Sequence, residues 1–450
     1  MAPGQAMGHV VLGAPPVARY HLHERLLRAL RQRGHRVSLL PLAPAEATFW
    51  RHQGEYLARL PANGARQTVA NWPFDDLAPA RRHGRRRRFA DRAAALAAWL
   101  GAERPDLMVL HQRRDDDAAL LHFAARAHGC RTLWFGDGLL PHTLQCDERG
   151  LDGDAAAAAR RADDFRVVRP DRELLAACLT HALAQAAPFA LPRAAIHVPP
   201  LAERVHDAMA TAQTDGLPAG WASLRAFAAA LPSTPTKAAP WRLPASPFLT
   251  VLLQATDDPR VVRDAVQPAT ATELVAAAAA ASRALGCDGR LAVVAAQAPA
   301  DRLVAGHALL PARAAALAAA TGLAVATINH PMASVALLAG TPVVHLGRAL
   351  YGMRGVANAA ADVGDLGAAL ARALAHDHPA LRTRALTWLF THGHVWCSAT
   401  APDHNGIVGM VMAIEARLPG AGARQPLRHR RGPPWPLAPA RPGPHGDRTN

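Results

Sequence analysis

The residues best suited to chemistry gather in one glycine-rich stretch, residues 134–154, which follows a short apolar run. Within it, Asp137 stands between two glycines, where the backbone can come close to a ligand. Three more aspartates could complete a pair that acts as nucleophile and as general acid or base; they are Asp147, Asp152 and Asp154. The structural alternative is a Gly-Asp-Gly turn, in which the carboxylate of Asp137 only accepts hydrogen bonds from nearby N–H groups.

Two other polar stretches follow apolar runs. Residues 327–334 lie between a predicted strand and a predicted helix, where N–H groups and a partial positive charge can receive a phosphate. The candidate ligands there are Asn329, His330 and Ser334, although a lone histidine such as His330 can equally be a capping or packing residue. Residues 113–117 precede another predicted helix, and helix capping is sufficient to explain their three aspartates.

The familiar local motifs are missing. The sequence contains no GxGxxG, P-loop, HExxH or GxSxG pattern. His392 and His394 stand close together, but two histidines without a third ligand rarely bind a metal. The five cysteines are scattered and form no CxxC pair, which favours a reducing compartment. We therefore predict neither a metal site nor a cofactor.

Strands and helices alternate twice along the chain, and each series must position the polar stretches that follow its strands. The first series has predicted strands at 9–12, 36–40, 107–110 and 132–135, and predicted helices at 18–33, 91–100 and 118–127. The second has strands at 248–253, 291–295, 323–327 and 342–346, and helices at 272–285, 311–320, 332–339, 366–376 and 380–390. Such alternation predicts a parallel, doubly wound sheet in each half.

The predicted fold class is α/β, with two Rossmann-like domains facing a cleft in a GT-B-like arrangement. We place the first domain at 1–210, a linker or crossover at 211–247, the second domain at 248–419, and a disordered Pro/Arg-rich tail at 420–450. Ligands of such sheets bind outside the carboxyl ends of the strands, so the cleft is the predicted site.

Composition limits the classes of function. Half of the 450 residues are hydrophobic, which excludes a disordered chain, and no apolar run is long enough to span a membrane. The sequence shows no signal peptide, so we expect a soluble, cytoplasmic protein. The net charge of +15 comes almost wholly from arginine, concentrated at 81–88 and after residue 419. These clusters could attract an anionic membrane surface or an acidic sugar, or could simply be solvated. Without a recognition motif, nucleic acid is not a predicted partner.

The acidic stretch also carries a family resemblance. Gly136-Asp137-Gly138-Leu139-Leu140-Pro141 and Asp147-Glu148-Arg149-Gly150-Leu151-Asp152-Gly153-Asp154 resemble two motifs of the capsule polysaccharide biosynthesis/export family. That family includes retaining β-Kdo transferases. Weaker similarities cover residues 10–40, 252–258, 336–344 and 346–351.

The resemblance implies a glycosyltransferase that moves a CMP-activated acidic sugar, Kdo-like, to a lipid-linked or glycan acceptor near the inner membrane. It makes Asp137 the first candidate for the nucleophile and Asp147 the second. The implied substrate-binding residues are Gly138, Asp154 and Gln254, and the implied nucleotide-binding residues are Asn329, His330, Ser334, Gly347 and Tyr351. The nucleotide sugar would lie on the C-terminal half and the acceptor on the N-terminal half. No metal is required on this interpretation, because CMP leaves with a single phosphate.

Four positions depart from the family pattern. Gly136 replaces an acidic residue, residues 296–299 replace a Lys-x-His-Pro step, His330-Pro331 replaces a Ser-Thr pair, and Val335 replaces a glutamate. The last three changes remove charges or hydroxyls from the nucleotide side. They leave open an alternative function, that of a non-catalytic capsule biosynthesis or export protein that binds glycan or partner enzymes.

Overall fold

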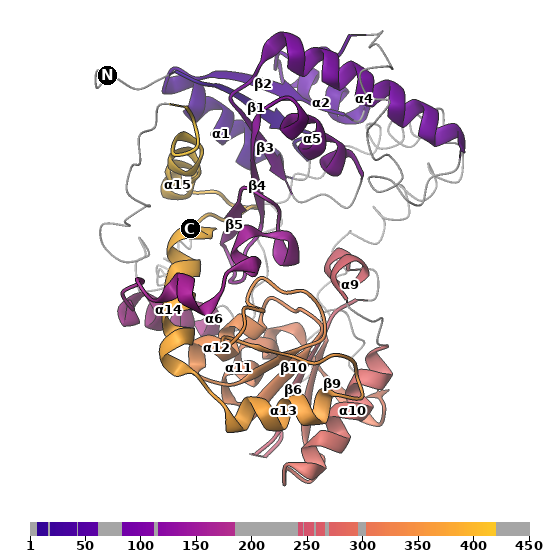
Figure 1. The fold of residues 1–450 in the computed structure, drawn as a ribbon, viewed down its shortest axis with the longest axis vertical. Coiled ribbons are helices and arrows are strands. Elements are labelled where there is room, and N and C mark those ends of the chain that lie inside the picture. Colours follow the sequence, from indigo (N-terminus) through magenta and orange to yellow (C-terminus); the bar gives the residue numbers. More distant parts are fainter. Residues whose placement is uncertain are drawn as a thin grey trace, which may run out of the picture.

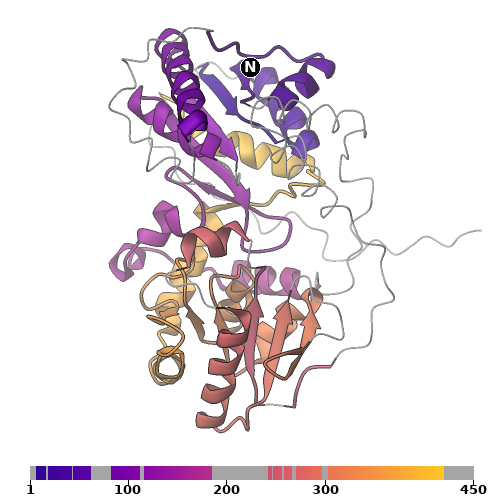
Figure 2. The same ribbon diagram turned by 90° about the vertical axis from the view of Figure 1, so that its right-hand side faces the viewer.

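The computed structural model describes residues 7–16, 19–42, 44–61, 83–111, 116–184, 242–245, 247–255, 258–265, 270–295 and 303–419. Two α/β lobes are stacked along the long axis (Figures 1 and 2). Each lobe is built on one mainly parallel sheet, so the predicted fold class of two Rossmann-like domains is confirmed. Most of the predicted linker, residues 296–299 and the tail lie outside the described residues.

The N-terminal lobe contains a six-stranded sheet in the order β13-β5-β4-β3-β1-β2. Four strands run parallel: β1 (His9–Gly13), β2 (Arg36–Leu40), β3 (Leu107–His111) and β4 (Arg131–Asp137). β5 (Leu144–Asp147) pairs antiparallel with β4 as a hairpin, and β13 (His394–Val395) pairs antiparallel with β5. The acidic stretch therefore forms this hairpin and the loop after it.

Alternate strand residues face opposite sides of this sheet, and helices cover both sides. Val10 packs with α1 (Tyr20–Gln32) and α15 (His404–Glu415), whereas Val11 packs with α4 (His83–Glu103) and α5 (Asp116–Ala127). α2 (Pro44–His52) contributes Trp50 to the first of these cores. Of Arg85–Arg88, only the backbone within α4 is described.

The C-terminal lobe contains a seven-stranded sheet in the order β12-β11-β10-β6-β7-β9-β8. Its strands are β6 (Leu249–Leu253), β7 (Leu291–Ala295), β8 (Leu303–Val304), β9 (His307–Pro311), β10 (Ala324–Thr327), β11 (Val343–His345) and β12 (Asn358–Ala359). Only β8 pairs antiparallel. One face is covered by α10 (Ala271–Ala284) and α13 (Leu366–Ala375), and the other by α11 (Ala315–Thr321) and α12 (Ala333–Ala339). The short α9 (Pro259–Asp264) follows β6.

The chain crosses between the lobes in ways that the predicted boundaries miss. Three 3₁₀ helices (Asp152–Asp154, Ala156–Ala159 and Ala162–Phe165) lead to α6 (Arg172–Ala184), which packs against α12 and α14 (Pro379–His392) of the second lobe. After α14 the chain returns, so β13 and α15 complete the first lobe. Figure 2 shows α15 beside the N-terminal sheet. The predicted second domain, which ran to residue 419, therefore ends near residue 392.

No helix among the described residues is long and apolar enough to cross a membrane.

Candidate active site

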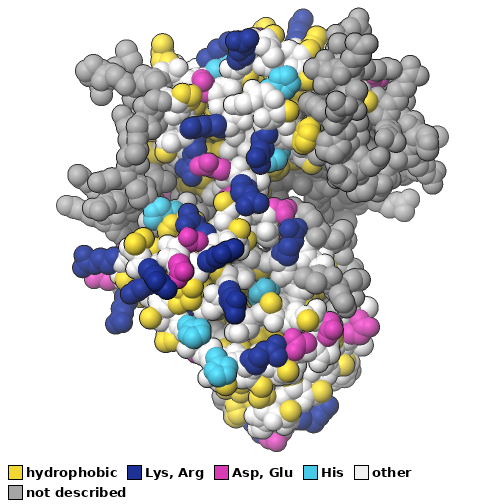
Figure 3. Space-filling view, viewed as in Figure 1, with side chains coloured by type: hydrophobic (Ala, Val, Ile, Leu, Met, Phe, Trp, Pro, Cys, Tyr) yellow, Lys and Arg dark blue, Asp and Glu magenta, His cyan; other side chains and the backbone are white. Residues whose placement is uncertain are grey.

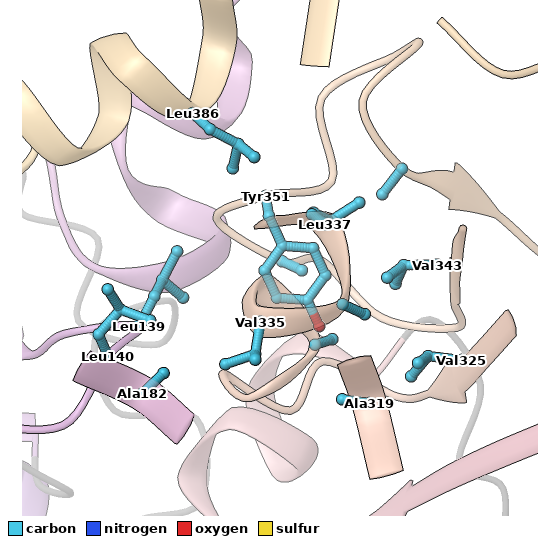
Figure 4. Close-up of a cluster of buried hydrophobic side chains, with 14 of the residues drawn as sticks. Leu139, Leu140, Ala182, Ala319, Val325, Val335, Leu337, Val343, Tyr351 and Leu386 are labelled. Atoms are coloured by element: carbon cyan, nitrogen blue, oxygen red, sulfur yellow. The ribbon is translucent and has the colours of Figure 1, made fainter. Parts of the chain in front are cut away.

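The turn between β4 and β5 joins the two lobes. Leu139 and Leu140 leave the N-terminal sheet and are buried in the core of the second lobe, near Val335 and Tyr351 (Figure 4). The hydroxyl of Ser334 donates to the carbonyl of Leu139 over 3.2 Å. These contacts fix the position of Asp137, the last residue of β4, where the two lobes meet.

Gly138 is required by the turn itself. A Cβ at this position would lie 2.1 Å from the hydroxyl of Thr143 and 2.9 Å from its carbonyl carbon. The N–H of Gly138 donates to the carbonyl of Thr143 over 2.9 Å, which closes the turn. The sequence predicted Gly138 as a substrate-binding residue, and its observed contacts are those of a close approach within the hairpin.

The carboxylate of Asp137 is exposed at the junction, with a cation from each lobe beside the residue. Its side chain is 58% exposed and pairs with the guanidinium of Arg19 at 2.7 Å. From the opposite lobe, Arg260 donates to the carbonyl oxygen of Asp137 over 3.4 Å. Arg19 precedes α1 and Arg260 lies in α9. Both arginines thus come from segments that follow the carboxyl end of a strand.

Asp147 is held by the main chain. The N–H groups of Arg149, Gly150, Ala156 and Ala157 donate to its two carboxylate oxygens over 2.8–3.3 Å. The residue is only 8% exposed. Because hydrogen bonds from the chain itself already occupy both oxygens, Asp147 is placed to organise the acidic loop.

Two further aspartates of the acidic loop bind arginines of the second lobe. Asp152 pairs with Arg260 at 3.1 Å, and both side chains are nearly buried. Arg348 bridges the lobes, since it pairs with Asp154 at 2.9 Å and with the fully buried Asp264 at 2.8 Å. Burial by itself would lower the pKa of Arg260, but nearby carboxylates, that of Asp152 first, raise it above its ordinary value. Three of the four predicted carboxylates therefore hold the loop or the lobes together.

The residues predicted to bind the nucleotide gather at the carboxyl ends of β6, β10 and β11. The N–H of Asn329 donates to the side-chain oxygen of Gln254 over 3.2 Å, and its side-chain amide donates to the carbonyl of Arg260 over 2.9 Å. The hydroxyl of Tyr351 donates to the carbonyl of His330 over 2.9 Å. Gly347 approaches Ile328 so closely that a Cβ would lie 3.0 Å from the Ile328 side chain.

This cluster contains two buried polar atoms that accept or donate no hydrogen bond within the described part of the chain. They are the amide nitrogen of Gln254 and the side-chain oxygen of Asn329. Buried polar groups normally have partners. The amide nitrogen of Asn329 bonds to the backbone carbonyls of Arg260 and Arg348, so both unpartnered atoms belong to side chains close to these two arginines.

The helix N-terminus expected to receive a phosphate is already occupied. α12 has only seven residues, and the N–H groups of Ala333, Ser334 and Val335 donate to the carbonyls of the three residues before the helix. Burial, with Arg260 nearby, lowers the pKa of His330 to about 4, so its ring is neutral at pH 7. The expectation of free N–H groups at this position is therefore wrong; Arg260 and Arg348 provide the positive charge.

A pair of histidines lies close to Arg19 in the first lobe, and the sequence analysis did not predict it. His111 ends β3, and its ring centroid lies 4.1 Å from that of His23 in α1. His111 is 1% exposed, and neither of its ring nitrogens has a hydrogen-bond partner among the described residues. Burial, His23 and Arg19 hold the pKa of His111 well below its ordinary value. One guanidinium nitrogen of Arg19 is also buried and has no partner in the described part of the chain.

The described residues contain no cluster of three or more metal-ligating side chains. His394 instead supports the turn: it accepts from the N–H of Leu139 over 3.1 Å and contacts the carbonyl of Leu389 over 3.1 Å. Outside the junction, Asp117 of the 113–117 stretch pairs with Arg92 of α4 at 2.7 Å, which ties α5 to α4.

Buried neutral histidines should make the fold sensitive to acid. Burial lowers the pKa of both His330 and His394 to about 4, against 6.5 in an unfolded chain. Between pH 4 and pH 6.5 the unfolded state therefore binds more protons than the folded state. The stabilisation is complete above pH 6.5 and is lost as the pH falls toward 4, by about 3 kcal/mol for each histidine. Urea denaturation between pH 4.5 and 7.5 measures this loss.

The matched variants for this measurement are His394→Gln and His404→Gln, the latter at an exposed position of α15. His394→Gln keeps an acceptor for the N–H of Leu139 but cannot titrate. Its unfolding free energy should fall less steeply below pH 6.5 than that of the wild type or of His404→Gln. Parallel pH profiles for all three proteins would contradict the assignment.

Comparison with protein-family models gives no match, and comparison with curated proteins gives none either. Among solved structures, the chain is similar to the glycosyltransferase of kitacinnamycin (15% identity, 92% of this chain and 100% of that chain, TM-score 0.34). It is also similar to Thermosulfurimonas dismutans KpsC, beta Kdo 2,4 transferase (14% identity, 80% of this chain and 100% of that chain, TM-score 0.34). A third similar structure is that of UDP-GlcNAc 2-epimerase from Methanocaldococcus jannaschii (10% identity, 85% of this chain and 98% of that chain, TM-score 0.29). At such TM-scores these similarities carry no information about chemistry, which must be deduced from the site itself.

Proposed function

We propose that this protein is a glycosyltransferase that uses a nucleotide sugar, with Asp137 as the residue that attacks the sugar. The observation that carries the proposal is the exposed carboxylate of Asp137, which pairs with Arg19 of one lobe while Arg260 of the other lobe bonds to the backbone carbonyl of the same residue. A carboxylate between cations suits a reaction in which an anionic donor must approach an anionic nucleophile.

The proposed donor is a CMP-activated acidic sugar such as Kdo, and the proposed acceptor is a lipid-linked or glycan hydroxyl of capsule or surface-polysaccharide synthesis at the inner membrane. The family resemblance of the acidic stretch motivates this choice. Arg260 and Arg348 would neutralise the donor phosphate. The amide nitrogen of Gln254 and the side-chain oxygen of Asn329, which have no partner among the described residues, would bond to polar groups of the nucleotide. Arg19, which is close to the buried His111, would face the acceptor.

The proposed reaction has two steps and retains the anomeric configuration. The carboxylate of Asp137 attacks the anomeric carbon, the bond to the phosphate oxygen breaks, and CMP leaves. The acceptor hydroxyl then attacks the same carbon, its proton passes to solvent, and Asp137 leaves as a carboxylate. Asp147 would act as a positioning residue, because it holds the loop that carries Asp152 and Asp154.

Release of the nucleotide tests the proposal directly. The purified full chain would be incubated with CMP-Kdo and, separately, with UDP-, GDP- and dTDP-sugars, each with and without a phosphatidylglycerol-type acceptor. We expect CMP release that depends on the acceptor, and a product whose anomeric configuration, measured by NMR, equals that of the donor. Absence of nucleotide release and of nucleotide binding with every donor would refute the proposal.

One observation favours the alternative of a non-catalytic glycan-binding protein. Ser334 is fully buried and donates to Leu139, and the first N–H groups of α12 are already bonded. Fewer groups are thus free to receive a nucleotide than the family pattern implies. This alternative predicts binding of an acidic oligosaccharide in calorimetry without any nucleotide release, and no effect of Asp137→Asn on capsule production.

A further inference from the structure

A second basic site lies away from the junction, on the surface of the C-terminal lobe. A pocket of about 1040 Å³ is formed by the 3₁₀ segment around Phe165, the loop at Gly355 and the start of α14. Arginine side chains gather on this side of the molecule, at the left edge of the view in Figure 3. Five of them line the pocket: Arg160, Arg161, Arg166, Arg354 and Arg384.

Most of this positive charge is uncompensated. The two acidic residues of the pocket are already paired, Asp163 with Arg166 at 2.7 Å and Asp377 with Arg382. The other four lining arginines have no carboxylate partner within the described part of the chain. Four unpaired guanidinium groups around one concavity repel one another, and a bound anion would relieve that repulsion.

Several of these groups are held in place rather than freely solvated. The guanidinium of Arg160 lies 4.1 Å from the ring centroid of Trp388, and that ring also stacks on His392 and meets the ring of Phe165 edge-on. Arg384 donates to the carbonyl of Arg166 over 3.5 Å, and its Nε is buried without an acceptor among the described residues. α14 begins at the pocket with no side-chain cap, so its N-terminal dipole adds to the positive potential.

We propose that this pocket binds a ligand with two or more phosphate groups, at a site separate from the inter-lobe junction. Arginine favours phosphate because its planar guanidinium donates two parallel hydrogen bonds to it. Several arginines around one concavity suit adjacent phosphates better than a single small anion, and the volume leaves room for an attached group. Two sources share this chemistry, a soluble diphosphate compound and the headgroups of an anionic lipid surface. This inference does not depend on the glycosyltransferase proposal.

Inorganic pyrophosphate is the first probe, titrated calorimetrically into the full chain. The pocket variant is Arg161→Ala/Arg354→Ala, because both residues are exposed and should not affect folding. The control is Arg126→Ala/Arg283→Ala, which removes the same charge from exposed helix positions outside the pocket. We expect the Kd for pyrophosphate to rise at least ~10-fold in the pocket variant, to stay unchanged in the control, and to rise with salt in the wild type.

Sedimentation with phosphatidylglycerol vesicles separates the two sources. If the pocket variant loses vesicle binding and the control keeps it, the pocket binds phosphate groups of a lipid surface, which supports the proposal. If the pocket variant loses pyrophosphate binding, the control keeps it and no protein binds the vesicles, the proposal is supported with a soluble diphosphate compound as the ligand. If both double variants lost binding equally, the effect would come from the net charge of the protein alone, and the proposal would be overturned. The proposal would also be overturned if the protein bound neither pyrophosphate nor the vesicles. A third contrary result would be that Arg348→Ala weakens pyrophosphate binding and the pocket variant does not.

Discussion

Asp137→Asn should abolish sugar transfer while leaving the fold intact. An amide cannot form the glycosyl ester and leave again as a carboxylate, so the rate of nucleotide release should fall by at least ~10³-fold. The side chain is 58% exposed and its ion pair with Arg19 lies near the surface, so its loss should cost less than about 1 kcal/mol of unfolding free energy. Initial rates of CMP release and the thermal midpoint measure the two effects.

Asp288→Asn is the matched control for this experiment. Asp288 also has an exposed carboxylate, 2.7 Å from an arginine, but it lies in the loop before β7. The rate of CMP release by Asp288→Asn should equal that of the wild type. If Asp137→Asn keeps wild-type activity and folds normally, another group is the nucleophile. If wild type and variant both bind glycan but release no nucleotide, the non-catalytic alternative is favoured.

The regular elements could be predicted because their patterns are local. Val10 and Val11 lie in a strand buried on both faces, and Leu22, Leu26 and Leu30 line one side of α1. The return of the chain to the first lobe could not be predicted in this way. α15 contains Gly406 and Gly409 and is apolar on most of its surface, which hides the helical period. β13 has two residues, and only its partner β5 defines it as a strand.

The acidic stretch was identified from its residue types, but the roles of its members depend on partners distant in the sequence. Asp147 and Asp137 look alike in the sequence, yet one is bonded to four N–H groups and the other is exposed beside Arg19. Arg260 and Arg348 carry no local signal, because arginine is abundant along this chain. Their roles arise only when the two lobes come together. The fold then brings Arg260 into contact with Asp152, 108 positions away in the sequence, and Arg348 into contact with Asp154, 194 positions away.

Arg260→Met should destabilise the protein strongly, because it leaves a charge buried without its partner. The side chains of Arg260 and Asp152 are only 13% and 9% exposed, and Asp152 is held in place by its N–H bond to Gln145. Removing one member of such a buried pair costs about 3–5 kcal/mol, most of it the penalty of the unpaired charge. Urea denaturation, followed by both tryptophan fluorescence and circular dichroism, measures the loss.

Two further variants separate the buried charge from other effects of the substitution. Arg31→Met removes an arginine from a more exposed pair, with Glu55 at 2.9 Å, and should cost less than about 1 kcal/mol. Adding Asp152→Asn to Arg260→Met removes the stranded carboxylate and should restore most of the lost stability. If the double variant were no more stable than Arg260→Met, the main loss would instead come from the hydrogen bond that Arg260 donates to the carbonyl of Asp137. The ion pair would then add little to the stability that the β4–β5 turn already gives the junction, and the backbone bond of Asp137 would account for the effect of Arg260.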